Sequence, residues 1–390
     1  MAKLDVVHGW NQVRDYLPAD YSALADEHAQ VETKFGNSKI RDADTLLRFI
    51  LLHVGANLGL RQTVALMAEA GLPSLSPMRL HKKMCRAAPY LQALVSRLVN
   101  WTDSTTSERW GGYVFTAVDA TVVCGPGAVG TDARIHTKLR LADVCMSGVQ
   151  VTDEHIGESF CRFDWQPGEL AVGDRAYWTG PGVSHVLRAG ADVLVRWRLK
   201  SLPLLAKNGD IVDVLAKVRR LQHGAVLDED LVARCDDGPV AGRLIAMRLP
   251  NDAAERARQR VRKEKGAAAS AESLEAAGFV VLFTTALRDR LSAERCLEGY
   301  RVRWQIELQF KRWKSLCGFD LLPNQRDDTI LAWLYAKVLL GALLDRMASI
   351  PTEVFPPGPS ILATDVMRSL EADEHPVPPR HRRSAATRAA

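Results

Sequence analysis

YRVRWQIELQFKRWK, residues 300–314, contains neither proline nor glycine and mixes charged with bulky apolar side chains. This composition predicts one amphipathic helix. At about 100° per residue, four polar side chains fall within about 60° of one another and form a single stripe. The stripe consists of Tyr300, Arg303, Glu307 and Lys314. The opposite side is apolar and wide enough to pack on a core; it consists of Val302, Ile306, Phe310, Trp313 and Leu316.

Two interpretations of this stripe are open. It is either a functional surface or a solvated face, whose pairs of Glu307 with Arg303 or with Lys311 add roughly a few tenths of a kcal/mol. The spacing Y-x(2)-R-x(3)-E-x(6)-K favours the first, because it resembles the signature of DDE transposases of the insertion-sequence-4 group. The surrounding residues, RWQIELQFKRWKSL, are also similar to that family.

Two aspartates end strand-like runs of β-forming residues. Asp119 lies in AVDATVV and Asp174 lies in LAVGDRAYW. An aspartate at such a position commonly caps a turn or a helix. Together with Glu307, however, the two provide three carboxylates from separated segments. A divalent-metal site needs this arrangement, because Mg²⁺ and Mn²⁺ take oxygen ligands and usually keep several waters.

The resemblance covers most of the chain and implies roles for these residues. AVDATVV and GELAVGDRAYW look like the family's blocks that hold the first and second catalytic aspartates. The implied catalytic residues, which bind two Mg²⁺ (or Mn²⁺) ions, are Asp119, Asp174 and Glu307. The implied DNA phosphate-binding residues are Tyr300, Arg303 and Lys314.

Aromatic residues near this site are candidates for base stacking. In the family, the signature is associated with a hairpin DNA intermediate and a base flipped out of the stack, which needs an aromatic platform. Trp304, beside the stripe, and Trp197, at the start of the expected insertion, are the candidates. The alternative is that both are core aromatics.

The N-terminal part of the chain is expected to be helical. An apolar helix follows Asp42, and a second runs from Leu60 to Ala70. Ser76 and Pro77 open a third as N-cap and first residue. The third helix is basic, and its candidate DNA-binding residues are Arg79, Lys82, Lys83 and Arg86. This pattern predicts a helix-turn-helix-like DNA-binding domain, although a solvated basic face would look the same.

The order of elements predicts an α/β fold. Strand-like runs after residue 110 come first and then alternate with helices. With the resemblance, we expect an RNase H-like mixed sheet with flanking helices, an inserted mainly-β subdomain and an N-terminal all-helical domain. The expected boundaries are 1–100 for the helical domain, 110–200 and 278–350 for the two parts of the catalytic core, 201–277 for the insertion, and 351–390 for a Pro-rich, basic and disordered tail.

Composition sets further bounds. A chain of 390 residues with 47% hydrophobic and 25% charged residues is typical of a soluble globular protein of two or three domains. The net charge of +5 fits a nucleic-acid binder. The 7 cysteines contain no C-x-x-C pair, which argues against a disulfide framework and a structural zinc. The longest apolar run, 330–348, contains Lys337 and Asp345, so no membrane span is expected.

The leading hypothesis is a metal-dependent DNA transposase. Its expected partners are double-stranded DNA, both the terminal inverted repeats of the element and the target, and a second copy of the chain in a homodimer on DNA. The expected location is the bacterial cytoplasm, associated with the nucleoid. Two alternatives are an RNase H-like nuclease without transposition and a non-catalytic DNA-binding relic that uses residues 40–100 alone.

Overall fold

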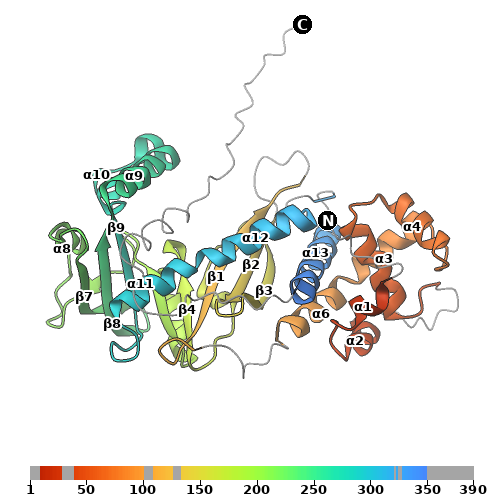
Figure 1. Ribbon diagram of the computed structural model, residues 1–390, viewed down its shortest axis with the longest axis horizontal. Coiled ribbons are helices and arrows are strands. Elements are labelled where there is room, and N and C mark those ends of the chain that lie inside the picture. The colour runs from red at the N-terminus through yellow and green to blue at the C-terminus, as the bar shows by residue number, and fades with distance from the viewer. Residues whose placement is uncertain are drawn as a thin grey trace, which may run out of the picture.

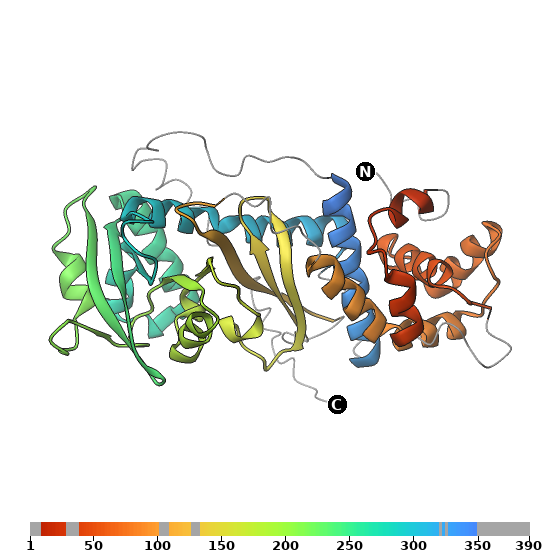
Figure 2. The ribbon, with the colours of Figure 1, turned by 90° about the horizontal axis from the view of Figure 1, so that it is seen from below.

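The computed structural model describes residues 9–28, 39–100, 109–125, 133–319, 322–323 and 327–348. The molecule is elongated, with the N-terminal helices at one end, a sheet through the middle and a long hairpin at the other end (Figure 1, Figure 2). The tail predicted at 351–390 lies outside the described residues.

Within the described residues, nine strands form one mixed sheet in the order β3-β2-β1-β4-β5-β9-β8-β7-β6. β1, β2 and β3 form an antiparallel meander, and β4 and β5 run parallel to β1. These five strands with flanking helices confirm the predicted α/β, RNase H-like fold class. Their bounds are β1 (Val114–Val123), β2 (Ala133–Arg140), β3 (Cys145–Asp153), β4 (Glu169–Gly173) and β5 (Asp192–Arg196).

The expected insertion does not form a sheet of its own. β9 pairs antiparallel with β5. β8, β7 and β6 are then added in turn, each antiparallel to the strand before it, because the free backbone groups at the edge of each strand form hydrogen bonds with the next. Three α-helices and one 3₁₀ helix share the segment, so it is less dominated by strands than expected. The elements of the insertion are β6 (Leu204–Leu205), α8 (Val214–Arg219), β7 (Val226–Cys235), β8 (Gly238–Arg248), α9 (Asn251–Lys265), η3 (Gly266–Ala268) and α10 (Ala271–Ala276), and β9 (Phe279–Thr284) follows it as the first strand of the second part of the core.

Helices cover both faces of the sheet. α11 (Ala293–Val302) and α12 (Trp304–Cys317) cross one face and lead to α13 (Asp327–Ala348), whereas α7 (Gly180–Arg188) covers the other (Figure 2). Side chains alternate between the faces. Along β1, Ala117 therefore packs in the core cluster that includes α12, and Val118 packs in the cluster that includes α7. The 3₁₀ helices η1 (Phe160–Arg162) and η2 (Arg175–Tyr177) flank β4.

The N-terminal helices form where capping residues predict them. The Asp42 carboxylate caps α3 by accepting the Thr45 N–H at 2.6 Å, and Ser76 caps α5 with Pro77 in its first turn. Residues 70–76 connect α4 to α5, which is longer than the three- to four-residue turn typical of helix-turn-helix motifs. The helices of this part are α1 (Trp10–Arg14), α2 (Tyr21–His28), α3 (Ala43–Gly55), α4 (Leu60–Glu69), α5 (Pro77–Arg86) and α6 (Ala88–Asn100).

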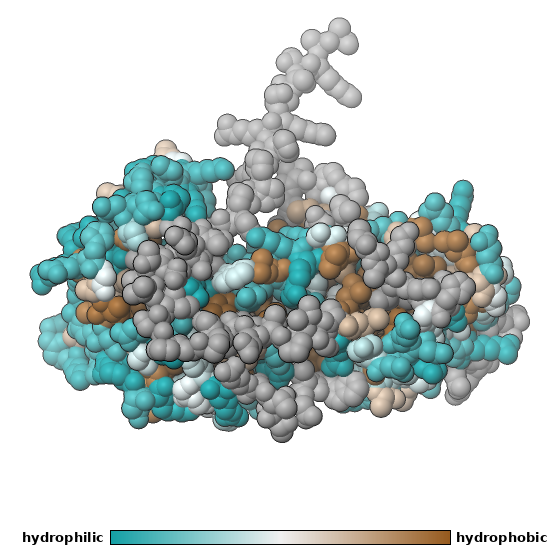
Figure 3. All heavy atoms as spheres, viewed as in Figure 1, coloured by the Kyte–Doolittle hydropathy of each residue, from teal (hydrophilic) through white to brown (hydrophobic). Residues whose placement is uncertain are grey.

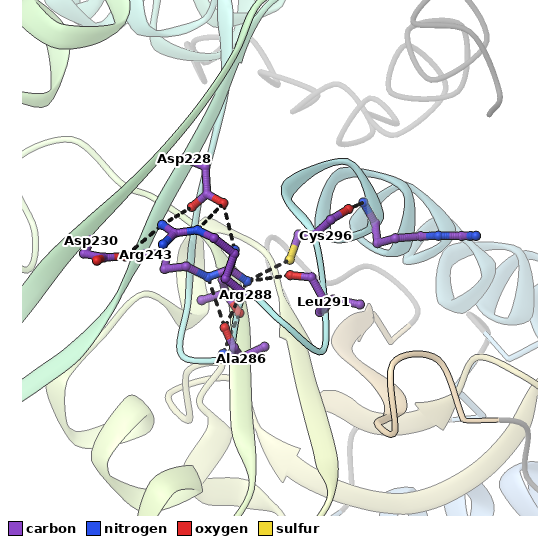
Figure 4. Close-up of polar contacts among 10 residues, drawn as sticks. Asp228, Asp230, Arg243, Ala286, Arg288, Leu291 and Cys296 are labelled. Atoms are coloured by element: carbon purple, nitrogen blue, oxygen red, sulfur yellow. Dashed lines mark hydrogen bonds and ion pairs between the residues drawn. The ribbon is translucent and has the colours of Figure 1, made fainter. Parts of the chain in front are cut away.

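A buried arginine anchors the insertion hairpin to the rest of the core (Figure 4). Arg243 on β8 is 5% exposed; its Nη1 donates to Asp228 on β7 at 2.9 Å. Its Nη2 donates to the carbonyl oxygens of Ala286 at 2.9 Å and Leu291 at 2.8 Å. These carbonyls lie in the loop between β9 and α11, so the network fixes the segment that leads into the helix pair.

The surface at the insertion end is mostly hydrophilic, as the teal side chains over α9 and α10 show (Figure 3). In the part of the chain that the structure describes, we find no helix with both the length and the apolar character needed to cross a lipid bilayer.

Candidate active site

Two neighbouring parallel strands bring Asp119 and Asp174 to matching positions in the sheet. Asp174 directly follows β4, as predicted. The prediction that Asp119 also ends a strand is wrong, because β1 continues beside β2 as far as Val123 and Asp119 pairs with Thr137 inside it. Ala117 on β1 lies opposite Val172 on β4, and each aspartate comes two residues later in its chain. Asp174 also caps η2, because its Oδ1 accepts the Ala176 N–H at 2.7 Å. The capping and catalytic interpretations of this aspartate are therefore compatible, since its second carboxylate oxygen is not used by the cap.

The predicted single helix over residues 300–314 is divided at Arg303. The Arg303 N–H donates to the Tyr300 carbonyl at 3.1 Å, and the Ile306 N–H donates to the Arg303 carbonyl at 3.1 Å, so the chain makes a tighter, 3₁₀-like turn between α11 and α12. The faces of the two helices are thereby offset. Tyr300 is 1% exposed, although the stripe predicted it on the polar side, and Leu316 is 54% exposed, although it was expected on the apolar side.

Arg303 connects two of the three predicted catalytic carboxylates. Its Nη2 lies 2.8 Å from Glu307 Oε1, and its Nη1 lies 3.4 Å from Asp119 Oδ2. Only 6% of the Arg303 side chain is exposed, against 17% for Asp119 and 20% for Glu307. In this structure, therefore, Arg303 neutralises carboxylates, and its predicted contact with DNA phosphate stays a prediction. The contact also shows that Glu307 reaches Asp119 across the face of the sheet.

Several acidic residues influence the carboxyl group of Asp119. Burial raises the pKa of the Asp119 carboxyl to about 8, although the Arg303 guanidinium beside it acts in the opposite direction. Three further carboxylates add to the rise and therefore lie near Asp119: Asp174, Glu158 and Glu307. The structure thus joins Asp119 and Glu307 through Arg303 and places Asp174 within electrostatic reach of Asp119.

Glu158 is an acidic residue of the site that the sequence did not predict. It precedes η1, and burial raises the pKa of its carboxyl to about 7, with Asp174 adding to the rise. The guanidiniums of Arg134 and Arg303 oppose this rise. A single glutamate in a polar loop carries no periodic or motif signal, so only the folded arrangement identifies it.

The donor set fits a hard divalent cation. Carboxylate oxygens are the ligands that Mg²⁺ and Mn²⁺ prefer, and Asp119, Asp174, Glu158 and Glu307 outnumber the guanidiniums that face them. No three of the described His, Cys, Asp and Glu residues are close enough together to hold a metal ion as they stand. The Arg303 side chain lies between Asp119 and Glu307 and takes the place of a cation in balancing their charge.

The remaining predicted residues have different surroundings. Lys314 and Trp304 are half-buried on α12. Trp197 is 9% exposed and packs in the core cluster of the α7 face, a position that favours the core interpretation of this tryptophan. On α5, Arg79, Lys82 and Arg86 are exposed and Lys83 is half-buried; Leu80 and Met84 pack inward between them.

The comparisons agree with this geometry. A family model described as a transposase DDE domain matches residues 110–341. The putative transposase InsL for insertion sequence element IS186A of Escherichia coli (strain K12) is 31% identical over 328 residues, which are 82% of this chain and 88% of that protein. The transposase for insertion sequence element IS421 of Escherichia coli is 32% identical over 329 residues, again 82% of this chain and 88% of that protein. The chain therefore belongs to the DDE transposase family, in the insertion-sequence-4 type.

Proposed function

We propose that the chain is a metal-dependent DNA transposase that binds the ends of its own insertion element, cleaves DNA strands there and joins them to target DNA in the bacterial cytoplasm. The observation that carries this proposal is that Asp119 and Glu307, from separated segments, contact the same Arg303 guanidinium, while Asp174 acts on the Asp119 carboxyl from the neighbouring strand. An acidic site on a mixed sheet, with carboxylates that can hold divalent cations, supports phosphoryl transfer.

Each site residue has a defined task in this proposal. Asp119, Asp174 and Glu307 hold two Mg²⁺ or Mn²⁺ ions, which when bound activate the attacking oxygen and stabilise the leaving oxygen in an in-line displacement at phosphorus. Arg303 keeps Glu307 turned toward Asp119 and offers its guanidinium to a phosphate of the DNA. Lys314, two turns along α12 from Glu307, binds the neighbouring phosphate as a point charge.

The test of this proposal uses the full chain and DNA that carries the inverted repeats flanking its gene. With Mg²⁺ we expect strand breaks at the repeat boundary that leave 3′-OH ends, and these ends become joined to a target plasmid; with EDTA neither product forms. Gel electrophoresis separates the products. Cleavage without joining identifies the nuclease alternative, and specific binding without cleavage identifies the DNA-binding relic.

A basic surface on α5 is the second part of the proposal. Arg79, Lys82 and Arg86 point away from the apolar side of the helix, and a groove of about 540 Å³ borders Lys82 and Arg86. Such a helix can bind the phosphate backbone and reach the major groove. Because the connection between α4 and α5 is longer than in a standard helix-turn-helix, we propose that α5 docks on DNA in a different orientation.

We expect the triple variant Arg79→Ala, Lys82→Ala, Arg86→Ala to bind element ends roughly 10- to 100-fold more weakly near 0.1 M salt, because each lost cation removes counterion release. The slope of log affinity against log salt should become less steep by about one for each lost phosphate contact. Fluorescence anisotropy measures both quantities. The matched control neutralises three exposed cations in or next to the insertion, Lys200, Lys207 and Arg219. Equal losses in the two variants would contradict a specific role of α5.

The active form is proposed to be a dimer on DNA, because two element ends must be brought together before joining. Analytical ultracentrifugation of the protein with end DNA should show two chains and two ends in the complex that joins. A complex of one chain that joins ends would exclude this arrangement.

A further inference from the structure

Tyr177 lies next to the candidate active site but has no role in the chemistry described so far. It ends η2, the 3₁₀ helix that Asp174 caps. Its ring packs against Phe160, with 5.0 Å between the ring centroids, and beneath Gly173, where an added Cβ would come within 2.8 Å of the Tyr177 Cβ. The ring is therefore held in place by close packing directly behind the end of β4.

Within the described residues, the buried hydroxyl of Tyr177 lacks the hydrogen-bond partner that buried hydroxyls usually have. The residue is 0% exposed, and among the described residues its oxygen has no hydrogen-bond partner. A buried polar group without a partner costs free energy, and native structures contain few of them. An unpaired hydroxyl beside an active site therefore suggests that its partner is in place only when the site is loaded.

The surroundings of this hydroxyl are acidic. Burial raises the pKa of Tyr177 well above its usual value, so the phenol keeps its proton. Three carboxylates act in the same direction and therefore lie near it: Asp119, Glu158 and Asp174. The hydroxyl is thus a single buried donor in acidic surroundings, on a ring packed against Gly173, the last residue of β4 before Asp174.

We propose that Tyr177 is a positioning residue of the active site, whose hydroxyl donates a hydrogen bond to an aspartate carboxylate when that carboxylate binds a divalent cation. This inference rests on the proposed function. Donors behind ligating carboxylates fix the orientation of the ligand and raise metal affinity. Tyr177 is too enclosed to touch DNA itself, so its effect is exerted through Asp119 or Asp174.

The test compares Tyr177→Phe with a matched control, Tyr90→Phe. Tyr90 on α6 is also 0% exposed, and its hydroxyl also has no partner within the described part of the chain, but it lies in the helical N-terminal part. Isothermal titration of the full chains with Mn²⁺ should show roughly 10- to 100-fold weaker binding for Tyr177→Phe, as for other residues behind metal ligands, and unchanged binding for Tyr90→Phe. DNA binding without divalent ions should be unchanged in both.

The outcomes of this titration separate failure of the inference about Tyr177 from failure of the proposed metal site. If the unmodified chain binds Mn²⁺ and Tyr177→Phe binds it equally well, the inference is wrong while the proposed function stands. If the unmodified chain does not bind Mn²⁺, the proposed metal site itself fails. If Tyr177→Phe without metal unfolds at a lower temperature than Tyr90→Phe, the substitution itself destabilises the protein. The increase in melting temperature that Mn²⁺ causes is then compared between Tyr177→Phe and the unmodified chain. A smaller increase for Tyr177→Phe supports the inference, and an equal increase overturns it.

Discussion

Replacing Glu307 by Gln is expected to lower strand cleavage at element ends by about a thousandfold, equivalent to roughly 4 kcal/mol of transition-state stabilisation. The glutamine amide has nearly the same shape and can still accept the hydrogen bond that Arg303 Nη2 makes to Glu307 at 2.8 Å. The substitution therefore preserves the helix junction and removes mainly the negative charge that a divalent cation needs. The affinity of the protein for element ends should change by less than about twofold, because we propose that α5, and not Glu307, makes the contacts that bind the ends.

The matched control is Glu298→Gln on α11. Glu298 pairs with Arg295 at 3.2 Å, so it is also a helical glutamate paired with an arginine, but that arginine does not contact the site's carboxylates. Cleavage is followed on labelled end DNA with Mg²⁺, and binding is followed by gel shift in EDTA. Cleavage by Glu307→Gln at the rate of the unmodified chain would exclude Glu307 as a metal ligand.

The sequence predicts well the strands that carry or precede the two aspartates, because local pattern and motif agree there. The strand-like runs around Asp119 and before Asp174 have the β-forming composition that the structure confirms as β1 and β4. Parallel pairing of these two strands then follows from the fold class. The sequence analysis also named capping as an alternative role for Asp174, and the structure shows that cap, because Asp174 Oδ1 accepts the Ala176 N–H. The proposed metal-binding role uses the same carboxylate.

Other features depend on contacts that no local pattern contains. The buried Tyr300 and the exposed Leu316 follow from the tight turn at Arg303, which a regular 100° wheel cannot represent. The continuation of the sheet through β9 depends on pairing between segments about ninety residues apart, as for Leu194 opposite Thr284. Glu158 has no sequence signal, because its role arises only from where its loop lies.

Replacing Arg303 by Gln is expected to lower the free energy of unfolding of the metal-free protein by roughly 3–5 kcal/mol. Arg303 is 5% exposed and contacts both Asp119 and Glu307. At pH 9, above the raised pKa of the Asp119 carboxyl of about 8, its loss therefore leaves two largely buried carboxylates without a countercharge. Urea denaturation in EDTA measures this loss. Arg295→Gln, which breaks a more exposed pair on the preceding helix, should cost less than about 1 kcal/mol.

Divalent cations should reverse much of the effect of Arg303→Gln, because an ion bound between Asp119 and Glu307 supplies the positive charge that the arginine provided. Mn²⁺ should therefore raise the midpoint of urea unfolding more for Arg303→Gln than for the unmodified chain, since in the latter the guanidinium and the ion compete for the same carboxylates. An equal or smaller rise for the variant would mean that the ion does not bind between these two carboxylates. Arg303 would then act only as a structural counterion at the helix junction, and the metal site would have to be sought closer to Asp174.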